Sequence, residues 1–309
     1  MNAIITGAGG LIGSRFFELY SEKFKKIYQL GRTRAEIDAE WLEYDLSSGR
    51  TLSLPSVDAL FHFAGQTSVH HSKEDVLNDL VTNVIGLIQV LDALRNNGNK
   101  PFVLLAGTAT EVGYSDERMP IDEEYCSNPI TFYDISKLTA ERYLLQYVRE
   151  GWIDGCALRL CNVYGGTRDG QNCDRGIIDK IFQRALKGES VNIYGSGNYL
   201  RDYIHLDDVV AAFYLAWENR NQVNGQYFNL GTGVGTTLKE AFCLVSMLAE
   251  EVSGKKVILS SVDPPDGLSQ IEYRSFVADN RKFLGATNWR PRHTLESGIR
   301  YSYRNLFDS

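Results

Sequence analysis

A cluster of glycines directly after the first apolar run constrains this chain more than any other feature. Residues 2–13 read NAIITGAGGLIG, in which Ala3–Ile5 precede the glycines and the apolar pair Leu11 and Ile12 comes after most of them. The four glycines are Gly7, Gly9, Gly10 and Gly13. Glycine loses the most conformational freedom on folding, so such a cluster needs a structural reason. It makes either an ordinary tight strand-to-helix turn, or a turn that lets a phosphate approach bare backbone amides at a helix N-terminus.

Short apolar runs alternate with helix-like segments through the first half of the chain. The candidate strands are Ala3–Thr6, Lys26–Leu30, Ala59–Phe63, Phe102–Ala106 and Cys156–Leu160. This alternation predicts an α/β fold, a doubly wound parallel sheet of the Rossmann type with helices on both faces. The run YFNLGTG is expected to be a late strand that returns to the same sheet.

Two long helices are expected between these strands. In residues 74–98, apolar side chains recur every three or four positions, and the triplet NNG ends the helix. The apolar positions are Val76, Leu77, Leu80, Val81, Val84, Leu87, Ile88, Leu91 and Leu94. A second helix runs from Tyr133 to about Arg149. It has more apolar surface than a surface helix usually has, so we expect part of it to face a partner subunit in a homodimer.

The character of the sequence changes after about residue 165, where the stretch at 165–176 is polar and rich in turn residues. We expect residues 1–165 to form the Rossmann domain, with residues 200–233 returning to it. Residues 166–199 and 234–309 are then expected to form a smaller, C-terminal substrate-binding region.

The bulk composition argues against several classes of protein. The net charge is -7, whereas a general nucleic-acid binder presents a basic face. No apolar run approaches about 18 residues and the N-terminus enters a strand at once, so we expect no membrane span and no signal peptide. The five cysteines form no C-x-x-C pair, which is typical of reduced thiols in a cytoplasmic protein. His70 and His71 are sequence neighbours that should point apart, so we expect no metal site.

The end of the second strand indicates which dinucleotide the glycine turn would hold. This position of a Rossmann unit, about 20 residues beyond the glycines, meets the adenosine ribose, and an NAD site commonly has Asp or Glu there. The present chain has Gly31, Arg32 and Arg34 instead. An arginine suits a 2′-phosphate through a charge-assisted contact, so NADP(H) is favoured over NAD(H). The alternative is that Arg32 and Arg34 lie on a solvated loop.

A tyrosine and a lysine in the segment TFYDISKLTAERYL form a candidate catalytic pair. On a helix, Tyr133 and Lys137 share a face with a rise of about 6 Å. The ammonium is expected to lower the phenol pKa, and a phenol tuned in this way exchanges a proton with a carbinol or carbonyl oxygen. Thr108 and Thr110, just past the strand Phe102–Ala106, supply hydroxyls. The pair by itself is unspecific, and an exposed Tyr–Lys pair on a helix is the alternative.

Further motifs occur in a fixed order, namely TGAGGLIG, HFAGQTSV, LRLCNVYG and IYGSGNYLRDYIHLDDVV. Together with Tyr133 and Lys137 they make the whole chain resemble the extended short-chain dehydrogenase/reductases that act on nucleotide sugars. The resemblance implies a pyrophosphate on the glycine turn and a nucleotide-sugar substrate. The cofactor-binding residues that it implies are Gly7, Gly10, Leu11, Ile12, Gly13, Asp45, Leu46, Phe63, Ala64, Gly65, Asn83, Tyr133, Lys137 and Leu160.

The resemblance also implies substrate contacts at Ser68, Asn162, Tyr194 and Arg201, with Arg201 on the diphosphate and Tyr194 near the base. Plainer alternatives remain for three positions. Arg201 could pair with one of the nearby aspartates, Asp202, Asp207 or Asp208. Asn83 could be an ordinary buried polar group, and Asp45 could merely cap a helix.

One position departs from the family pattern. The catalytic Ser or Thr usually lies three residues before the valine of V-Y-G, which in this chain is Ala109, and V-Y-G itself has become Val112-Gly113-Tyr114. A one-residue shift of the loop brings either Thr108 or Thr110 into the role, and the sequence leaves that choice open.

Three reactions fit this scaffold. A 4,6-dehydratase of this family carries an Asp-Glu pair after the catalytic threonine, but here Thr110 stands where the aspartate would precede Glu111. A 4-epimerase recycles a tightly held NAD, which Arg32 disfavours. The segments GTATEVG and NPITFYDISK resemble those members that reduce dTDP-linked 4-dehydro-6-deoxy-sugars, so NADPH-dependent reduction of the C4 ketone is the favoured reaction. A dinucleotide-sensing or scaffold protein is a remote alternative, because such proteins usually lose the tyrosine or the lysine.

Overall fold

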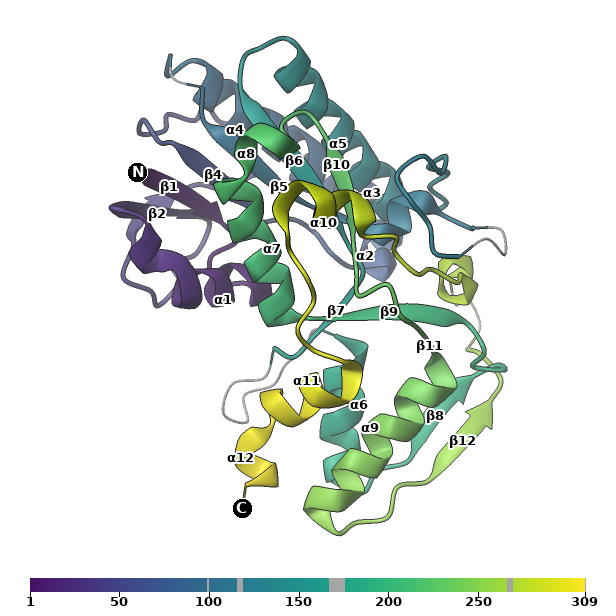
Figure 1. The fold of residues 1–309 in the computed structure, drawn as a ribbon. Helices are drawn as coiled ribbons and strands as arrows, with labels where there is room; N and C mark the ends of the chain where they lie inside the picture. The colour runs from purple at the N-terminus through teal and green to yellow at the C-terminus, as the bar shows by residue number, and fades with distance from the viewer. Residues whose placement is uncertain (99, 116–118, 167–175, 266–268, 309) are drawn as a thin grey trace.

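A seven-stranded sheet, parallel throughout, forms the centre of the larger part of the protein (Figure 1). The computed structural model describes residues 1–98, 100–115, 119–166, 176–265 and 269–308. The sheet order is β10-β6-β5-β4-β1-β2-β3. The strands are β1 Asn2–Thr6, β2 Lys26–Gly31, β3 Glu40–Glu43, β4 Ala59–His62, β5 Phe102–Thr108, β6 Asp154–Leu160 and β10 Tyr227–Leu230.

All five predicted strands are present, and YFNLGTG returns to the sheet as β10, beside β6. Within this seven-stranded sheet, only the edge strand β3 was not predicted. Its sequence EWLE has neither an apolar run nor a buried face, so it carries no strand signal. The strand order reverses at β1, which lies between β2 and β4. In open parallel sheets, ligands bind outside the carboxyl ends of the strands at such a switch point.

Alternate strand residues face two separate hydrophobic cores, as a sheet covered on both sides requires. Ile5 and Phe61 point into one core together with side chains of α1 (Leu11–Tyr20) and α7 (Leu206–Glu218). Their neighbours Ile4 and Leu60 point into the other core, which α4 (Gly86–Arg95) and α5 (Phe132–Arg149) cover. The predicted doubly wound α/β fold is therefore confirmed.

The first of the two long predicted helices is interrupted. It consists of α3 (Val76–Leu80), a π-helical turn (Val81–Ile85) and α4. The periodicity predicted one continuous apolar face, but Val76, Leu77 and Leu80 are exposed. The extra residue of a π turn rotates the preceding residues around the helix axis, which takes α3 out of the buried face.

The segment Val76–Arg95 is also long and apolar enough to cross a membrane by length and composition, with 44% of its most apolar window buried inside the protein. The segment is no uninterrupted apolar run, because Asn78, Asp79 and Asp92 lie within it. The test is weak, because a core helix passes it equally well, and α4 belongs to the second core.

A third core lies in the smaller region, where α6, α9 and α11 gather below the sheet (Figure 1). Two small sheets contribute side chains to this core, in the orders β11-β9-β7 and β12-β8. Their strands are β7 Asn162–Tyr164, β8 Val191–Tyr194, β9 Leu200–His205, β11 Gly235–Thr237 and β12 Leu259–Val262. The remaining α-helices are α2 Val69–Glu74, α6 Ile177–Leu186, α8 Arg220–Val223, α9 Leu238–Ser253, α10 Arg281–Thr287, α11 Leu295–Ser302 and α12 Arg304–Phe307. The segment 167–175, which holds most of the predicted crossing between the two parts and Cys173, lies outside the described residues.

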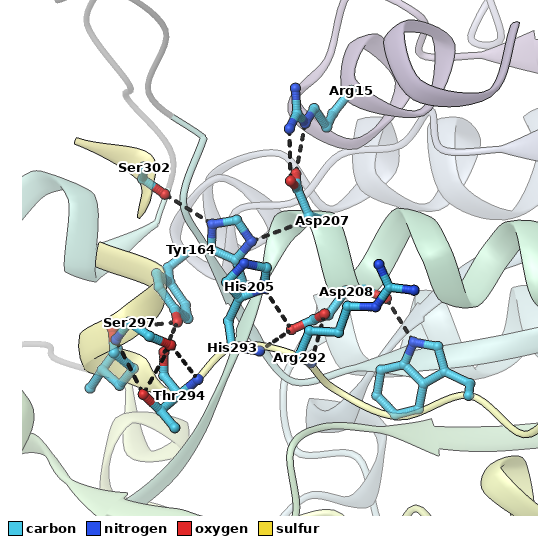
Figure 2. A network of polar contacts seen from close by, with 12 residues as sticks. Arg15, Tyr164, His205, Asp207, Asp208, Arg292, His293, Thr294, Ser297 and Ser302 are labelled. Carbon is cyan, nitrogen blue, oxygen red and sulfur yellow. Dashed lines mark hydrogen bonds and ion pairs between the residues drawn. The ribbon is translucent and has the colours of Figure 1, made fainter. Parts of the chain in front are cut away.

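A polar network joins α1, α7 and the C-terminal segment (Figure 2). Arg15 donates to both carboxylate oxygens of Asp207 at 2.7 Å. His205 caps α7 by accepting from the Asp207 amide, and its Nε2 lies 2.9 Å from the Ser302 hydroxyl. Asp208 accepts from the backbone amide of His293 at 3.1 Å. These contacts hold the smaller region against the helix that follows the glycine turn.

Candidate active site

The glycine turn connects β1 directly to α1, and glycine is required at two of its positions. Gly7 has φ +68°, and a Cβ there would lie 2.7 Å from the backbone nitrogen of Ala64. A Cβ on Gly13 would lie 2.3 Å from the Gly7 carbonyl oxygen, so this residue allows the helix to pack closely on the strand. Gly10 is the N-cap of α1 and no side chain caps the helix. The first amides of α1, which begins at Leu11 and Ile12, are thus left to backbone or ligand partners.

The end of β4 lies beside this turn. The Thr6 hydroxyl accepts from the Ala64 amide and contacts His62 Nδ1, each at 3.1 Å. Burial lowers the pKa of His62 to about 3, so the ring is neutral. Phe63 packs edge-on against Phe213 on α7, with ring centroids 4.8 Å apart. The loop that starts at Phe63 is therefore held rigidly next to the glycines.

Asn83 is the polar centre that holds the next part of this loop. It lies in the π turn, accepts from the Gln66 amide at 2.9 Å and donates to the Gln66 carbonyl oxygen at 3.2 Å. Its amide nitrogen is also 3.1 Å from the Ser136 hydroxyl on α5. A Cβ on Gly65 would lie 2.8 Å from Asn83 Oδ1 and 4.0 Å from Lys137 Nζ. Asn83 thus links the loop to the helix that carries Tyr133 and Lys137.

The structure brings Tyr133, Lys137, Thr108 and Thr110 together. Tyr133 and Lys137 lie on α5 and are both buried, so the exposed-pair alternative does not hold. Lys137 Nζ donates to the Ala106 carbonyl oxygen at 2.6 Å. Thr108, at the end of β5, hydrogen-bonds the Tyr133 side chain. Thr110 is 3.1 Å from Thr108, hydroxyl to hydroxyl.

The expected lowering of the Tyr133 pKa is not found. Burial raises this pKa above its ordinary value, the negative charge of Glu111 raises it further, and the Thr108 hydrogen bond opposes both. Burial also lowers the pKa of Lys137, against the charges of Glu111 and Asp79. The phenol is therefore held in its protonated form, which suits a proton donor.

The residues expected at the adenosine end lie on the surface. Arg32 and Arg34 follow β2 and are exposed, with no ion pair between either of them and another described residue. Asp45 accepts from the Ser47 amide and hydroxyl at 2.9 and 2.7 Å, and these bonds lower its pKa. It closes a turn and caps no helix. Leu46 packs against Gly86 of α4, where an added Cβ would lie 2.7 Å from the Leu46 Cβ.

Arg201 and Arg274 are buried neighbours on the substrate side, and neither has a carboxylate at ion-pair distance within the described ranges. Arg201 donates to the carbonyl oxygens of Arg274 and Glu272. The proposed ion pair with an aspartate is thus absent, since Asp207 pairs with Arg15. Burial lowers the pKa of Arg201 to about 10 and lowers that of Arg274, whose Nε has no hydrogen-bond partner among the residues that the structure describes. A buried cation without an acidic partner is costly, so an anionic ligand would stabilise this pair.

The other expected substrate residues are more scattered. Asn162 lies on β7 and Leu160 at the end of β6, so both follow the carboxyl edge of the sheet. Ser68 is the N-cap of α2, where its hydroxyl accepts from the His71 amide at 3.2 Å. Tyr194 ends β8 and is exposed.

A buried charge cluster lies behind Tyr133 and Lys137, and the sequence analysis missed it. Arg159 on β6 donates to both oxygens of Glu141 at 2.8 Å, and its Nε is 3.1 Å from Glu111. All three side chains are fully buried. The sequence shows Arg159 in the motif LRLCNVYG and Glu141 four residues after Lys137. No local pattern indicates that these two side chains are in contact.

His70 and His71 do not point apart as expected. Both Nδ1 atoms approach Glu74 Oε2, at 3.3 and 2.8 Å. The three side chains are exposed. The described cysteines, Cys126, Cys156, Cys161 and Cys243, are free.

Comparison with known proteins agrees with this geometry. The NAD dependent epimerase/dehydratase family matches residues 3–231. The chain belongs to this family. It is therefore an NAD(P)-dependent enzyme that acts on nucleotide sugars, and the family confirms the resemblance inferred from the motifs.

Three relatives show the range of activities. A putative UDP-glucose 4-epimerase of Methanocaldococcus jannaschii is 28% identical over 306 residues, which cover 96% of this chain and 95% of the relative. The dTDP-4-dehydro-6-deoxyglucose reductase of Escherichia coli is 27% identical over 250 residues, 80% of this chain and 74% of the relative. The crystal structure of the UDP-glucose 4-epimerase of Thermotoga maritima with UDP-glucose superimposes with a TM-score of 0.85 at 29% identity, covering 99% and 100% of the two chains.

Proposed function

We propose that this enzyme reduces the C4 ketone of a nucleotide-linked 4-dehydro-6-deoxy-sugar, with dTDP as the nucleotide carrier and NADPH as the reductant. The single observation that carries the proposal is the end of β2, where Gly31 and the exposed Arg32 stand in the place of the acidic residue that holds an NAD ribose. NADPH is the reductant that an enzyme takes from the cellular pool and consumes. A site that selects NADPH therefore fits a reductase.

The residues of the site fit a dinucleotide. Gly7 and Gly13 leave a cradle that a Cβ would fill, and the uncapped start of α1 offers amides to a pyrophosphate. Arg32 and Arg34 would reach the adenosine phosphate, and Asp45 the adenine. Lys137 and Tyr133 would hold the nicotinamide ribose, beside Gly65 and Asn83. The cofactor supplies the hydride that reduces the ketone.

In this proposal each catalytic side chain has one task. Tyr133 donates its proton to the forming C4 alkoxide, and its raised pKa keeps that proton in place beforehand. Thr108, which lies beside Tyr133, orients the ketone oxygen, and the Thr110 hydroxyl lies 3.1 Å from that of Thr108. Arg201 and Arg274 would bind the diphosphate, Asn162 and Ser68 the sugar, and Tyr194 the base. Because Tyr133 and Lys137 are buried away from water, their hydrogen bonds and charges act more strongly on the reacting atoms than they would in water.

A nucleotide-sugar 4-epimerase with a tightly held NAD is the second candidate. The full-length similarity to UDP-glucose 4-epimerases favours it, and the same Tyr133 and Lys137 would serve both directions of hydride transfer. The two candidates differ in one measurable respect, because an epimerase regenerates its cofactor and a reductase consumes it.

The decisive experiment incubates the enzyme with a panel of dTDP- and UDP-linked 4-keto sugars and with NADPH or NADH, followed at 340 nm with NMR of the products. We expect stoichiometric loss of NADPH and a C4 alcohol. Interconversion of UDP-glucose and UDP-galactose with no net change in cofactor would instead establish the epimerase. Tight NADPH binding with no turnover of any nucleotide sugar would support the sensing role.

Cofactor choice is tested at Arg32. A charge-assisted hydrogen bond contributes about 1.5–3 kcal/mol, so R32A should lower the NADPH-to-NADH ratio of kcat/KM by about 10- to 150-fold. Arg184 on α6, whose exposed partner is Glu189, provides the matched control, and R184A should leave the ratio unchanged. An unchanged ratio in R32A would place the arginine on a solvated loop.

We further propose that two copies associate through α3 and α5. These packed helices expose Leu77 and Ile135, with fractional exposures of 69% and 47%, beside other exposed apolar side chains, and such a patch marks an interface. Light scattering should give twice the chain mass of 34.7 kDa, and L77E with I135E should halve it. Met247 on α9 is equally exposed, at 63%, so M247E serves as the control.

A further inference from the structure

Glu111 is a buried carboxyl group with no role in the mechanism above. It lies in the short helix Ala109–Val112, directly after β5, and is completely buried. Its Oε1 accepts from the Thr108 amide at 2.8 Å, while Thr108 Oγ1 accepts from the Thr110 amide at 3.3 Å. This reciprocal capping box sets the backbone, and hence the side-chain direction, at Thr108.

The other carboxylate oxygen faces the charge cluster behind the active site. Glu111 Oε2 lies 3.1 Å from Arg159 Nε, and Glu141 binds the same guanidinium through two bonds of 2.8 Å. The Arg159 guanidinium also lies over the Tyr227 ring, 4.1 Å from its centroid. The cluster therefore joins the end of β5 to β6, β10 and α5.

Burial and the neighbouring charge of Glu141 raise the pKa of Glu111 to about 8, against the opposing effect of Arg159. Lys137 is a further buried cation, and its Nζ donates to the Ala106 carbonyl oxygen. Glu111 therefore changes its charge in the alkaline range, next to the Arg159 guanidinium. Asp79, Asp134, His62 and Arg274 are the other titratable or charged groups around Tyr133 and Lys137.

We propose that Glu111 is a positioning residue, which fixes Thr108 through its amide and links the site of Tyr133 and Lys137 to the buried Arg159 cluster. This inference rests on the proposed function, since it takes Thr108, Tyr133 and Lys137 as the catalytic groups. Glu111 does not touch substrate. Its burial against Arg159 distinguishes it from a glutamate that shuttles a substrate proton in a dehydratase.

Two substitutions separate its two tasks. In E111Q an acceptor for the Thr108 amide remains but the charge is lost, whereas E111V loses both. Glu123 is the matched control, because it is also a buried glutamate that accepts a backbone amide, that of Asn229 at 2.7 Å, away from the catalytic pair. Thermal unfolding of each variant establishes that it is folded.

The expected changes appear in the pH profile and in kcat, with KM within about twofold of wild type. The Glu111 charge raises the pKa values of Tyr133 and Lys137. Removing it lowers both, and reduction requires both groups protonated, so the alkaline limb of kcat should move to lower pH in E111Q. E111V should in addition lose at least tenfold in kcat at every pH, and E123Q should match wild type. Wild-type pH profiles in E111Q would overturn the proposal, even if E111V failed to fold.

A second readout keeps this test independent of the substrate. In protein with ¹³C-labelled tyrosine, the Tyr133 signal is assigned by its loss in Y133F, and its titration is followed by NMR. We expect the signal to titrate at lower pH in E111Q than in wild type. Lack of turnover in the wild-type enzyme would refute the proposed function alone, whereas an unchanged Tyr133 titration would refute the role of Glu111.

Discussion

Two bidentate Arg–Glu pairs of nearly the same geometry allow a direct test of how burial sets the importance of a charge. Arg159 binds Glu141 at 2.8 and 2.8 Å, and Arg300 binds Glu251 at 2.9 and 2.8 Å. The first pair is fully buried, whereas the side chains of Arg300 and Glu251 are 38% and 51% exposed. The two contacts match in length, so the comparison of E141Q with E251Q mainly varies the surroundings.

The expected magnitude follows from what each substitution leaves behind. Removing one partner of a buried ion pair costs about 3–5 kcal/mol, since the other charge stays in the interior. Glu111 remains 3.1 Å from Arg159 and the glutamine keeps one acceptor, so we place E141Q at the lower end, about 3 kcal/mol. Arg300 regains water when its partner is lost, and E251Q should leave stability unchanged within error.

Urea unfolding followed by circular dichroism measures the difference. The free energy of unfolding is expected to fall by about 3 kcal/mol per molar urea, so E141Q should lower the midpoint urea concentration by about 1 M. Both variants keep the same net charge, so nonspecific electrostatic effects cancel. Equal midpoints for E141Q and E251Q would refute the reasoning that burial makes the Glu141 contact essential.

Three further results are expected. Y133F should lower kcat by at least about 1,000-fold while the Kd for NADPH, measured by fluorescence, stays within about threefold; retention of a tenth of the activity would argue against Tyr133 as the acid. G7A should weaken NADPH binding and lower the Tm, because Gly7 has φ +68° and the new Cβ would lie 2.7 Å from the Ala64 backbone. G49A is the control, because Gly49 also has a positive φ but its added Cβ would meet no atom within 4 Å. G49A should therefore lower the Tm and leave NADPH binding unchanged. Burial lowers the pKa of His205 from 6.5 to about 4, so between these pH values the unfolded chain binds a proton that the folded chain does not. The free energy of unfolding should therefore fall as the pH drops from about 6.5 towards 4. H205Q should show a shallower fall over this window in pH-dependent unfolding, and an unchanged slope would exclude His205 as its source.

Local sequence patterns were sufficient for most of the fold and for part of the site. The spacing of apolar residues predicted five strands of the main sheet, because a buried parallel strand is a short apolar run. The glycines predicted the turn at β1, since only glycine adopts φ +68° against the Ala64 backbone without strain. The four-residue spacing placed Tyr133 and Lys137 on one helix face.

What the patterns could not predict depends on contacts between distant segments. How close Thr108 and Thr110 lie to Tyr133 depends on the geometry after β5, because Tyr133 belongs to another element. The raised Tyr133 pKa follows from burial and from Glu111, neither of which a tyrosine–lysine spacing contains. The exposure of Leu77 follows from a π turn that leaves the apolar period of the sequence unchanged.

By itself, the sequence determined the parallel sheet, the glycine turn and the helix that carries Tyr133 and Lys137. Backbone conformation and the spacing of apolar residues are local properties, which a sequence pattern contains. Only the tertiary structure decided which charges share the interior. Glu111, Glu141 and Arg159 come from three elements and meet at 2.8–3.1 Å, and Arg201 turned out to bind carbonyl oxygens in place of an aspartate. Electrostatic energies depend on distance and burial, and both are set by the packing of the whole chain.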